Sequence, residues 1–400
     1  MIKHNNKNQY IKNLRELLSE DLDSVIKREQ STFDNLVYPY NDRLVLFGAG
    51  GLGKKVLQGL RQIGTEPLAF VDNNPSFWQE KIDGLVVFDP KTASLRYGKD
   101  SVFIVTIWRA GGDHRLAKTQ KQLYDLGCKK VISFASLFWK FPGIFLPYYT
   151  IGLPHLLIMQ SSQILSAFNL LEDDNSRFEF IAQLRWRLHL DFDGLPSPVT
   201  HDQYFPDDLF TLISDEVFVD CGSFDGDSIR SFYQKKQVFN GKIFAIEPDP
   251  QNIKKLEMYL TSLDKSFKDS VSIIPKVVGR KYEILRFSAN GSASSVIDPE
   301  GIIEVECSPI DDIVGHINPT FIKMDIEGAE LDALNGATKS IRNSLPILAI
   351  SVYHLPDHLW RIPLFINSVT DQYHYFLRPH NEEGWDLVLY AIPNERLLKS

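Results

Sequence analysis

The sequence has few cysteines and no long apolar run. Its 400 residues include three cysteines, and these stand far apart as Cys128, Cys221 and Cys307. Without a Cys-x-x-Cys pair or a histidine-cysteine cluster, the chain has neither a zinc framework nor a disulfide scaffold. The polar N-terminal segment and the lack of about 18 consecutive apolar residues speak against a signal peptide and a membrane span. We therefore expect a protein of the reducing cytoplasm that does not insert into a membrane.

The sequence also lacks an excess of positive charge. Its net charge of −8 argues against general nucleic-acid binding. Hydrophobic residues make up 44% of the chain and charged residues 24%, which is typical of a globular protein. At roughly 150 residues per domain, the length favours two or three domains rather than one.

Three segments precede the C-terminal half. Residues 1–40 carry apolar side chains at spacings of three and four, which predicts a helical leader suited to packing or dimerisation, so a homodimer is one expected state. Residues 41–136 alternate strand and helix patterns and are predicted to form a doubly wound, Rossmann-like domain. Residues 137–212 are rich in aromatic residues and prolines before a helical periodicity begins, which predicts a helical connector or cap.

The first glycine-rich turn, LFGAGGLG, lies between a strand and a helix of the Rossmann-like segment. Gly48, Gly50 and Gly53 have GxGxxG spacing, and Asp72 ends the next strand pattern. Such a turn presents backbone N–H groups to phosphates, and the acid binds a ribose. The segment also resembles the N-terminal domains of sugar acyltransferases and nucleotide-sugar-modifying enzymes. The fingerprint is permissive, so a dinucleotide, a nucleotide sugar and no ligand at all are open alternatives.

Residues 213–400 contain seven further strand patterns. The last two, YHYFLRP and DLVLYAIP, are separated by HNEEGWD and can pair as an antiparallel hairpin. A sheet that ends in this way is typical of the S-adenosylmethionine-dependent methyltransferase fold. The predicted class is therefore α/β, with two doubly wound Rossmann-like domains joined by a helical connector. The C-terminal domain is predicted to be a seven-stranded methyltransferase sheet.

The second glycine-rich turn, VFVDCGSFDGDS, differs from the first. Asp220 stands where a dinucleotide fingerprint has its first glycine, and Gly222 and Gly226 follow. A carboxylate there repels a pyrophosphate but attracts the amino group of S-adenosylmethionine, which has no phosphate. Glu247 ends the next strand, where a carboxylate can accept hydrogen bonds from a ribose diol. The two features together predict a methyl-donor pocket.

These segments resemble the FkbM family of S-adenosylmethionine-dependent methyltransferases. The resemblance covers about residues 170–393 and rests on VFVDCGSFDGDSI, AIEPDP, GSASS, FIKMDIEGAELDAL, YHLPDHLWRIP and YHYFLRPH. It implies O-methylation of a sugar, glycan or polyketide-type natural product, so the expected partner is a small-molecule or glycan acceptor. We assign the donor to Asp220, Gly222, Ser223, Gly226, Asp227 and Glu247. Many relatives have Ala and Tyr where this chain has Ser223 and Phe224.

The reaction also needs a base that removes a proton from the acceptor. The resemblance places Asp325 near the reacting centre, and His354 ends the following strand pattern, so these two are the predicted catalytic residues. Other histidines of the C-terminal region leave the choice of base open. Asp325, Glu327 and Glu330 could instead help to hold Mg²⁺, although we expect no metal.

One rival function comes from the first turn. It would make the protein an NAD(P)-dependent oxidoreductase or epimerase of nucleotide sugars, driven by the N-terminal domain. Against it, no YxxxK pair follows the first fingerprint within that domain.

Overall fold

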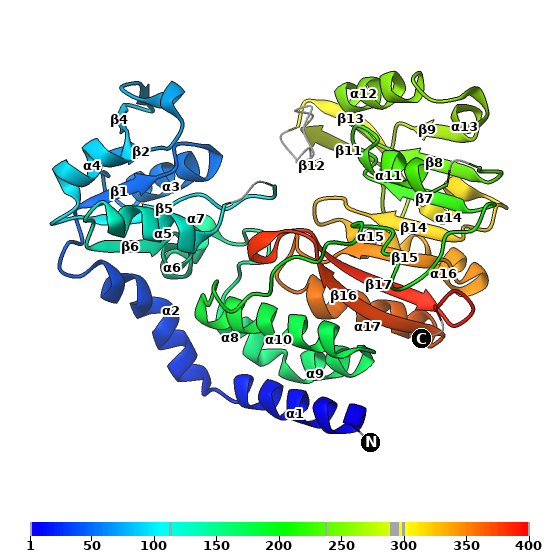
Figure 1. The fold of residues 1–400 in the computed structure, drawn as a ribbon, viewed down its shortest axis with the longest axis horizontal. Helices are drawn as coiled ribbons and strands as arrows, with labels where there is room; N and C mark the ends of the chain where they lie inside the picture. Colours follow the sequence, from blue (N-terminus) through cyan, green and yellow to red (C-terminus); the bar gives the residue numbers. More distant parts are fainter. Residues whose placement is uncertain (1, 112–113, 237, 289–295, 298–300, 399–400) are drawn as a thin grey trace. The chain divides into compact units, whose positions relative to one another are not determined.

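The computed structural model describes residues 2–111, 114–236, 238–288, 296–297 and 301–398 (Figure 1). The chain divides into two compact units that are not continuous in sequence. The first comprises Met1–Ser161, Ile181–Ser197 and Asn381–Trp385, and the second comprises the rest. Both units therefore take part of the predicted connector. None of the helices in the described part of the chain is long and apolar enough to cross a membrane.

The first unit contains a six-stranded sheet of order β3-β4-β2-β1-β5-β6. Its strands are β1 (Leu44–Phe47), β2 (Ala69–Val71), β3 (Lys81–Ile82), β4 (Leu85–Phe88), β5 (Val102–Val105) and β6 (Lys130–Ser133). Its helices are α1 (Ile2–Leu17), α2 (Leu22–Val37), α3 (Gly51–Gln62), α4 (Pro90–Tyr97), α5 (Leu116–Asp125), α6 (Ala135–Lys140), α7 (Pro142–Phe145) and α8 (Pro154–Met159), with the 3-10 turns η1 (Pro75–Phe77) and η2 (Glu382–Gly384). The pairings are parallel except between β3 and β4, which form a hairpin.

The sequence reasoning missed that hairpin, although its signal was present. Asp83 and Gly84 join the two strands with φ angles of +50° and +89°. An Asp-Gly pair with both residues in the left-handed region is a preferred two-residue hairpin turn. The LVVF segment is one of the strand patterns of residues 41–136, whereas its antiparallel partner, Lys81–Ile82, is only two residues long.

The second unit contains the predicted seven-stranded sheet, of order β16-β17-β15-β14-β7-β8-β9. Its strands are β7 (Val217–Cys221), β8 (Lys242–Ile246), β9 (Val271–Ile274), β14 (Phe321–Met324), β15 (Ile347–Ser351), β16 (Tyr373–Pro379) and β17 (Leu387–Pro393). Six strands run in the same direction, and β17, which pairs antiparallel with both β15 and β16, runs in the opposite direction. The predicted fold class and its terminal hairpin are confirmed. The tip of that hairpin, Asn381–Trp385, belongs to the first unit.

A four-stranded sheet that the sequence reasoning did not predict also belongs to the second unit. Its order is β10-β13-β11-β12, with β10 (Val277–Val278), β11 (Glu283–Ser288), β12 (Val296–Ile297) and β13 (Ile303–Ser308). The segment VSIIPKVV, one of the seven strand patterns of residues 213–400, therefore forms two strands, β9 and β10. Pro275 separates them, and a proline has no N–H to continue a ladder. The GSASS string of the resemblance (291–295) lies outside the described residues.

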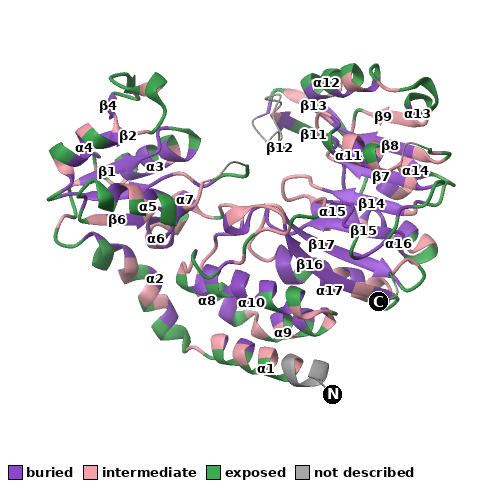
Figure 2. Ribbon diagram, in the orientation of Figure 1, coloured by how far each residue is buried: buried purple, intermediate pink, exposed green. Residues whose placement is uncertain are grey.

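Helices of the second unit pack around its larger sheet. They are α9 (Ser161–Leu170), α10 (Asp174–His189, shared with the first unit), α11 (Asp227–Lys235), α12 (Pro250–Leu260), α13 (Lys265–Asp269), α14 (Ile310–Val314), α15 (Glu330–Asn335), α16 (Thr338–Ser344) and α17 (His358–Val369). Strands β14 and β15 are buried along their whole length (Figure 2). Continuous apolar runs such as ILAI are typical of parallel strands that are covered on both faces.

The N-terminal glycine turn depends on the lack of a side chain at Gly53. A Cβ atom built there would lie 1.9 Å from the Gly48 carbonyl oxygen. This oxygen belongs to the backbone, so it cannot move aside as the end of a flexible side chain could. At Gly51, by contrast, a Cβ atom meets nothing within 4 Å. The third glycine of the fingerprint thus lets helix α3 approach the turn closely.

We expect Gly53→Ala to destabilise the protein, because the added methyl group must push helix α3 away from the turn. Overpacking of this kind costs about 1–3 kcal/mol. Gly51→Ala is the matched control, and it is expected to be neutral or slightly stabilising because alanine is the better helix former. Thermal unfolding of the two variants compares them directly, and equal unfolding temperatures would contradict the close approach.

Candidate functional site

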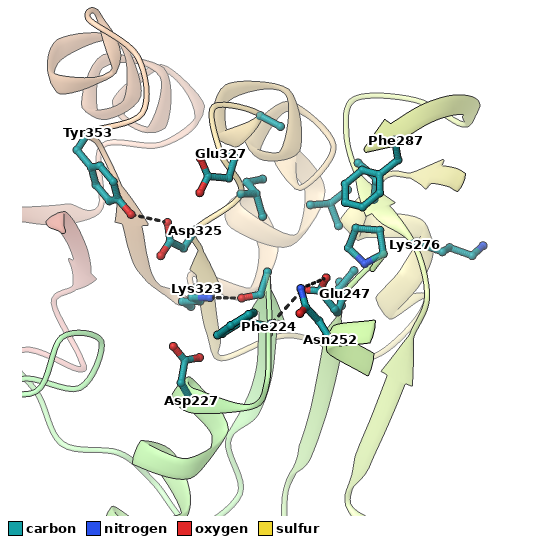
Figure 3. Close-up of a pocket in the computed structure, with 17 residues that line it drawn as sticks. Phe224, Asp227, Glu247, Asn252, Lys276, Phe287, Lys323, Asp325, Glu327 and Tyr353 are labelled. Atoms are coloured by element: carbon teal, nitrogen blue, oxygen red, sulfur yellow. Dashed lines mark hydrogen bonds between the residues drawn. The ribbon is translucent and has the colours of Figure 1, made fainter. Parts of the chain in front are cut away.

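A pocket opens at the carboxyl ends of β7, β8 and β14 in the second unit (Figure 3). Open parallel sheets bind ligands at this edge. Its polar lining consists of Asp227, Glu247, Asn252, Lys276, Lys323, Asp325, Glu327 and Tyr353. Apolar side chains including Phe224, Ile246, Val277 and Phe287 complete the wall. A mostly apolar cleft with a few convergent polar groups is the usual form of a small-molecule site.

A buried ion pair stands behind the pocket. The Lys323 ammonium lies 3.2 Å from Asp220 Oδ1 and donates a hydrogen bond of 2.6 Å to the Gly222 carbonyl. Asp220 Oδ2 accepts a further bond from the Ser228 hydroxyl. Burial lowers the pKa of Lys323, but the adjacent carboxylates, Asp220 first, outweigh burial and raise that pKa above its usual range. Asp220 is therefore already neutralised by the protein.

The turn after β7 brings the pocket wall into contact with the end of β14. Gly222 has φ +78°, and a Cβ atom there would lie 2.1 Å from the Asp325 carbonyl oxygen. Ser223 is buried and donates a hydrogen bond to the Asp220 carbonyl, while Gly226 precedes helix α11. Of these residues Gly222 lines the pocket, and Ser223 and Gly226 hold the turn behind it.

Glu247 directly follows β8 and its carboxylate is fixed in the wall. Oε2 accepts a hydrogen bond of 3.0 Å from the Phe224 N–H, and Oε1 accepts one of 3.0 Å from the Asp249 N–H. The Asn252 side chain adds a contact of 3.4 Å to Oε1. A carboxylate has about four lone-pair positions, so Oε2 can still accept from a ligand. Burial raises the pKa of Glu247 above its ordinary value.

Asp227 is the other carboxylate of this part of the wall. It begins helix α11, and burial raises its pKa, opposed mainly by the charge of Lys323. The predicted partners of the donor are thus separated in space. Asp220 lies behind the wall, paired with Lys323, whereas Asp227 lines the pocket.

Asp325 is held by side chains from two other segments of the chain. Its Oδ2 accepts a bond of 2.7 Å from the Tyr204 hydroxyl, and Oδ1 accepts one of 3.3 Å from the Tyr353 hydroxyl. His354 Nε2 lies 3.2 Å from the same Oδ1. Burial raises the pKa of Asp325, but His354 and the other donors outweigh burial and lower that pKa to about 2. Asp325 is therefore a stable carboxylate.

The two predicted catalytic residues are brought together, but His354 is buried behind Asp325. It lies three residues beyond the end of β15 rather than at its end, and its Nδ1 is 2.7 Å from Glu330 Oε1. Burial lowers the pKa of His354, and the two flanking carboxylates raise it well above its usual value. Both ring nitrogens face a carboxylate, so the ring carries a positive charge.

Glu330 anchors the loop that follows β14. Its Oε1 accepts hydrogen bonds from the Ile326 N–H, at 3.0 Å, and the Gly328 N–H, at 3.4 Å. His358 Nδ1 lies 3.2 Å from its Oε2. Glu330 thus fixes the loop of residues 325–328, and its own side chain is fully buried.

The family match follows from the same segments. Residues 220–379 match the family model of the methyltransferase FkbM domain. The chain contains an FkbM methyltransferase domain. The match begins at Asp220 and takes in the turn, Glu247 and the loop of residues 325–328. It confirms the predicted methyltransferase and the resemblance on which it rested.

Solved structures show how far the fold is shared. The crystal structure of methyltransferase FkbM from Methylobacillus flagellatus KT has a TM-score of 0.77 at 22% identity, covering 96% of this chain and 99% of its own. The precorrin-6y C5,15-methyltransferase of Geobacter metallireducens GS-15 covers 47% of this chain and 82% of its own, with 15% identity and a TM-score of 0.28. Aeropyrum pernix fibrillarin, crystallised with natively bound S-adenosyl-L-methionine, covers 45% and 69%, with 10% identity and a TM-score of 0.27. No curated protein matches the chain.

Asp325, Glu330 and His354 of the FkbM domain are close enough together to be considered for a metal ion. The imidazole lies between the two carboxylates, however, and each ring nitrogen faces one of them. Mg²⁺ prefers oxygen ligands, and here the imidazole stands between the two carboxylates. The cluster is therefore a charge network, and Mg²⁺ has no support from it.

The N-terminal turn uses its own acid. Asp72 Oδ2 accepts a hydrogen bond of 2.8 Å from the Ala49 N–H, and Oδ1 accepts one of 2.8 Å from the Asn74 N–H. Gly50 caps helix α3 with its backbone. One N–H of the turn is thus committed to the carboxylate that was expected to bind a ribose. This geometry favours a structural role for the turn.

The predicted site lacks five polar residues of the pocket wall. They are Lys323, which lies within β14, and Asn252, Lys276, Tyr353 and Glu327, the last of which was considered only as a metal ligand. The last four share a position, because each follows a strand of the larger sheet by a few residues. Nothing in their types distinguished them from ordinary loop residues.

We expect Lys323→Met to destabilise the FkbM domain, because it leaves the Asp220 carboxylate buried without a counter-charge. Removing one partner of a buried ion pair costs about 3–5 kcal/mol. The double variant Lys323→Met with Asp220→Asn removes both charges and should recover much of that loss. Lys281→Met is the control, since this lysine is exposed and its loss should cost at most about 0.5 kcal/mol. Urea unfolding measures all three, and a double variant no more stable than Lys323→Met would contradict the pairing.

Proposed function

We propose that this protein is an S-adenosylmethionine-dependent methyltransferase that methylates a hydroxyl group of a sugar, glycan or natural product. The observation that carries the proposal is Glu247. Its carboxylate sits at the end of β8, in the wall of the FkbM pocket, and is oriented by the Phe224 and Asp249 N–H groups. This is the position from which an acid accepts hydrogen bonds from the hydroxyl groups of a ribose.

The charges of the wall fit this donor better than a phosphate-containing cofactor. Asp227, Glu247, Asp325 and Glu327 line the pocket, and the two lysines of the wall are each paired with an acid. Like charges repel, so this wall disfavours a pyrophosphate. It favours a ligand with a positive amino group and a sulfonium. We assign the amino group to Asp227, because Asp220 is already paired with Lys323.

The adenine would lie against the apolar part of the wall. Ile246 and Pro248 flank Glu247, and Val277, Val278 and Phe287 come from the smaller sheet. An aromatic ring buried between apolar side chains gains most of its affinity from desolvation. The unpredicted sheet thus supplies one side of the donor pocket.

We expect calorimetry to detect binding of S-adenosylmethionine and S-adenosylhomocysteine, and no binding of NAD. Glu247→Gln should weaken both by about 10-fold to 100-fold, because hydrogen bonds to a charged group contribute about 1.5–3 kcal/mol. Asp227→Asn should also weaken both ligands, since both carry the amino group. Glu257→Gln is the control, because this acid is exposed on helix α12 and lies outside the pocket wall. Tight NAD binding without donor binding would favour an oxidoreductase instead.

The acceptor is tested separately. Incubation with methyl-labelled S-adenosylmethionine and a panel of methyl glycosides is expected to give an O-methyl ether, which mass spectrometry identifies. The acidic wall predicts that neutral glycosides react faster than sugar phosphates, because a phosphate meets repulsion from Asp325 and Glu327. Transfer to amino groups alone, or to phosphorylated sugars alone, would contradict the proposed acceptor.

A further inference from the structure

The acids in and behind the pocket differ in what the surrounding structure donates to them. Asp220 and Glu330 are engaged by cationic side chains, Glu247 by N–H groups, and Asp325 by two tyrosines and His354. Asp227 accepts a hydrogen bond from the Ser228 N–H and is the acid proposed above for the amino group of the donor. Glu327 differs. Its side chain lines the pocket. Among the residues that the structure describes, none donates a hydrogen bond to its carboxylate or forms an ion pair with it. Its lone pairs are therefore available to a ligand.

The backbone holds Glu327 in an unfavourable conformation. Its φ angle is +53°, in the left-handed region that suits glycine, and Gly328 follows with φ +104°. Non-glycine residues in this region are strained, and such strain is concentrated at functional sites. The loop keeps this shape because the Glu330 carboxylate accepts the N–H groups on both sides of Glu327. In Figure 3 the Glu327 carboxylate lies on the same side of the pocket as Asp325 and Tyr353.

We propose that Glu327 is the general base of the methyl transfer and takes the proton of the acceptor hydroxyl. The proposal rests on the proposed function, since it needs a hydroxyl acceptor. The acceptor oxygen forms a bond to the methyl carbon while the carbon–sulfur bond breaks and its electron pair goes to sulfur. The hydroxyl proton passes to the Glu327 carboxylate, which becomes a carboxylic acid and later releases the proton to water. Asp325 and His354 are then positioning residues.

The charges around Glu327 agree with this role. Burial raises its pKa to about 7, His354 opposes that rise, and Asp325, Glu330 and Asp386 add to it. A base is most effective when its pKa is near the working pH. Asp325, with a pKa of about 2, binds a proton too weakly, and the charged His354 has no lone pair to offer.

The decisive variant is Glu327→Gln, which keeps the shape of the side chain and removes its basicity. Single-turnover transfer from S-adenosylmethionine to the best methyl glycoside of the panel should slow by about 10²-fold to 10⁴-fold. Donor affinity should fall by much less than the rate, because the proton transfer is lost only in the transition state, whereas the charge of Glu327 also acts on the bound sulfonium. Asp332→Asn is the matched control, an exposed acid five positions further along.

The pH profile gives a second readout. A protonated Glu327 cannot accept a proton, so the rate of the unchanged protein should fall about tenfold per unit as the pH drops below about 7. It should level off above that value, and the fall should be absent in Glu327→Gln. A variant that keeps both the rate and the pH dependence would overturn the proposal.

Glu327→Gly separates catalysis from folding. Glycine relieves the positive φ angle, so this variant should unfold at a higher temperature and yet transfer the methyl group as slowly as Glu327→Gln. A lower unfolding temperature would show that the side chain supports the fold, which would overturn a purely catalytic role.

An acceptor-free measurement distinguishes failure of the base from failure of the acceptor class. If no glycoside is methylated, the proposed acceptor is wrong, and infrared titration of the carboxyl groups then tests Glu327. Burial raises the pKa of Glu383 to about 7 as well, so a carboxylic-acid band that titrates near pH 7 and is smaller in Glu327→Gln than in the unchanged protein and Asp332→Asn supports the base. The lack of such a band overturns it.

Discussion

The buried ion pair between Lys323 and Asp220 is the interaction on which the pocket depends. It joins neighbouring strands, because Lys323 and Asp220 are paired in register between β14 and β7. The lysine also donates to the Gly222 carbonyl, and the Asp325 carbonyl leaves no room for a side chain at Gly222. The turn that faces the donor and the loop that carries the acids are therefore held in one place by one ammonium group. A hydrophobic pair of similar volume could fill the space but could not fix those carbonyls.

Beyond this pair, the acids of the domain differ in their surroundings rather than in their type. Glu330 is fully buried beside His354 and His358. Asp325 contacts His354 as well, and it also accepts hydrogen bonds from Tyr204 and Tyr353. Glu327, between Asp325 and Glu330 in sequence, has burial without donors. The pKa values of Asp325 and Glu330 are therefore lowered, and that of Glu327 is raised. Different surroundings of this kind let carboxylic acids of the same type take different roles in one site.

Strand patterns and the terminal hairpin were predictable, because apolar periodicity and the HNEEGWD turn act locally. Glu247 was predictable for the same reason, since an acid at the end of a strand points to the ligand edge. Asp220 was placed correctly in the chain but not in space: nothing local shows that Lys323, about a hundred residues later, takes its charge. The contrast between Glu327 and Asp325 was also out of reach, because it arises from Tyr204 and His354, which come from distant segments.

The proposed reaction changes the charges in the pocket, and the surroundings of Glu327 favour that change. Before transfer, the pocket would hold two opposite charges, the sulfonium and the Glu327 carboxylate. After transfer, the thioether and the carboxylic acid are both neutral. Burial that raises the pKa of Glu327 is the same effect that makes charge separation costly there, so the environment favours the direction in which both charges disappear. The carboxylates of Asp325 and Glu330 stay charged throughout the reaction, because the groups that stabilise their charge are side chains and N–H groups of the protein itself.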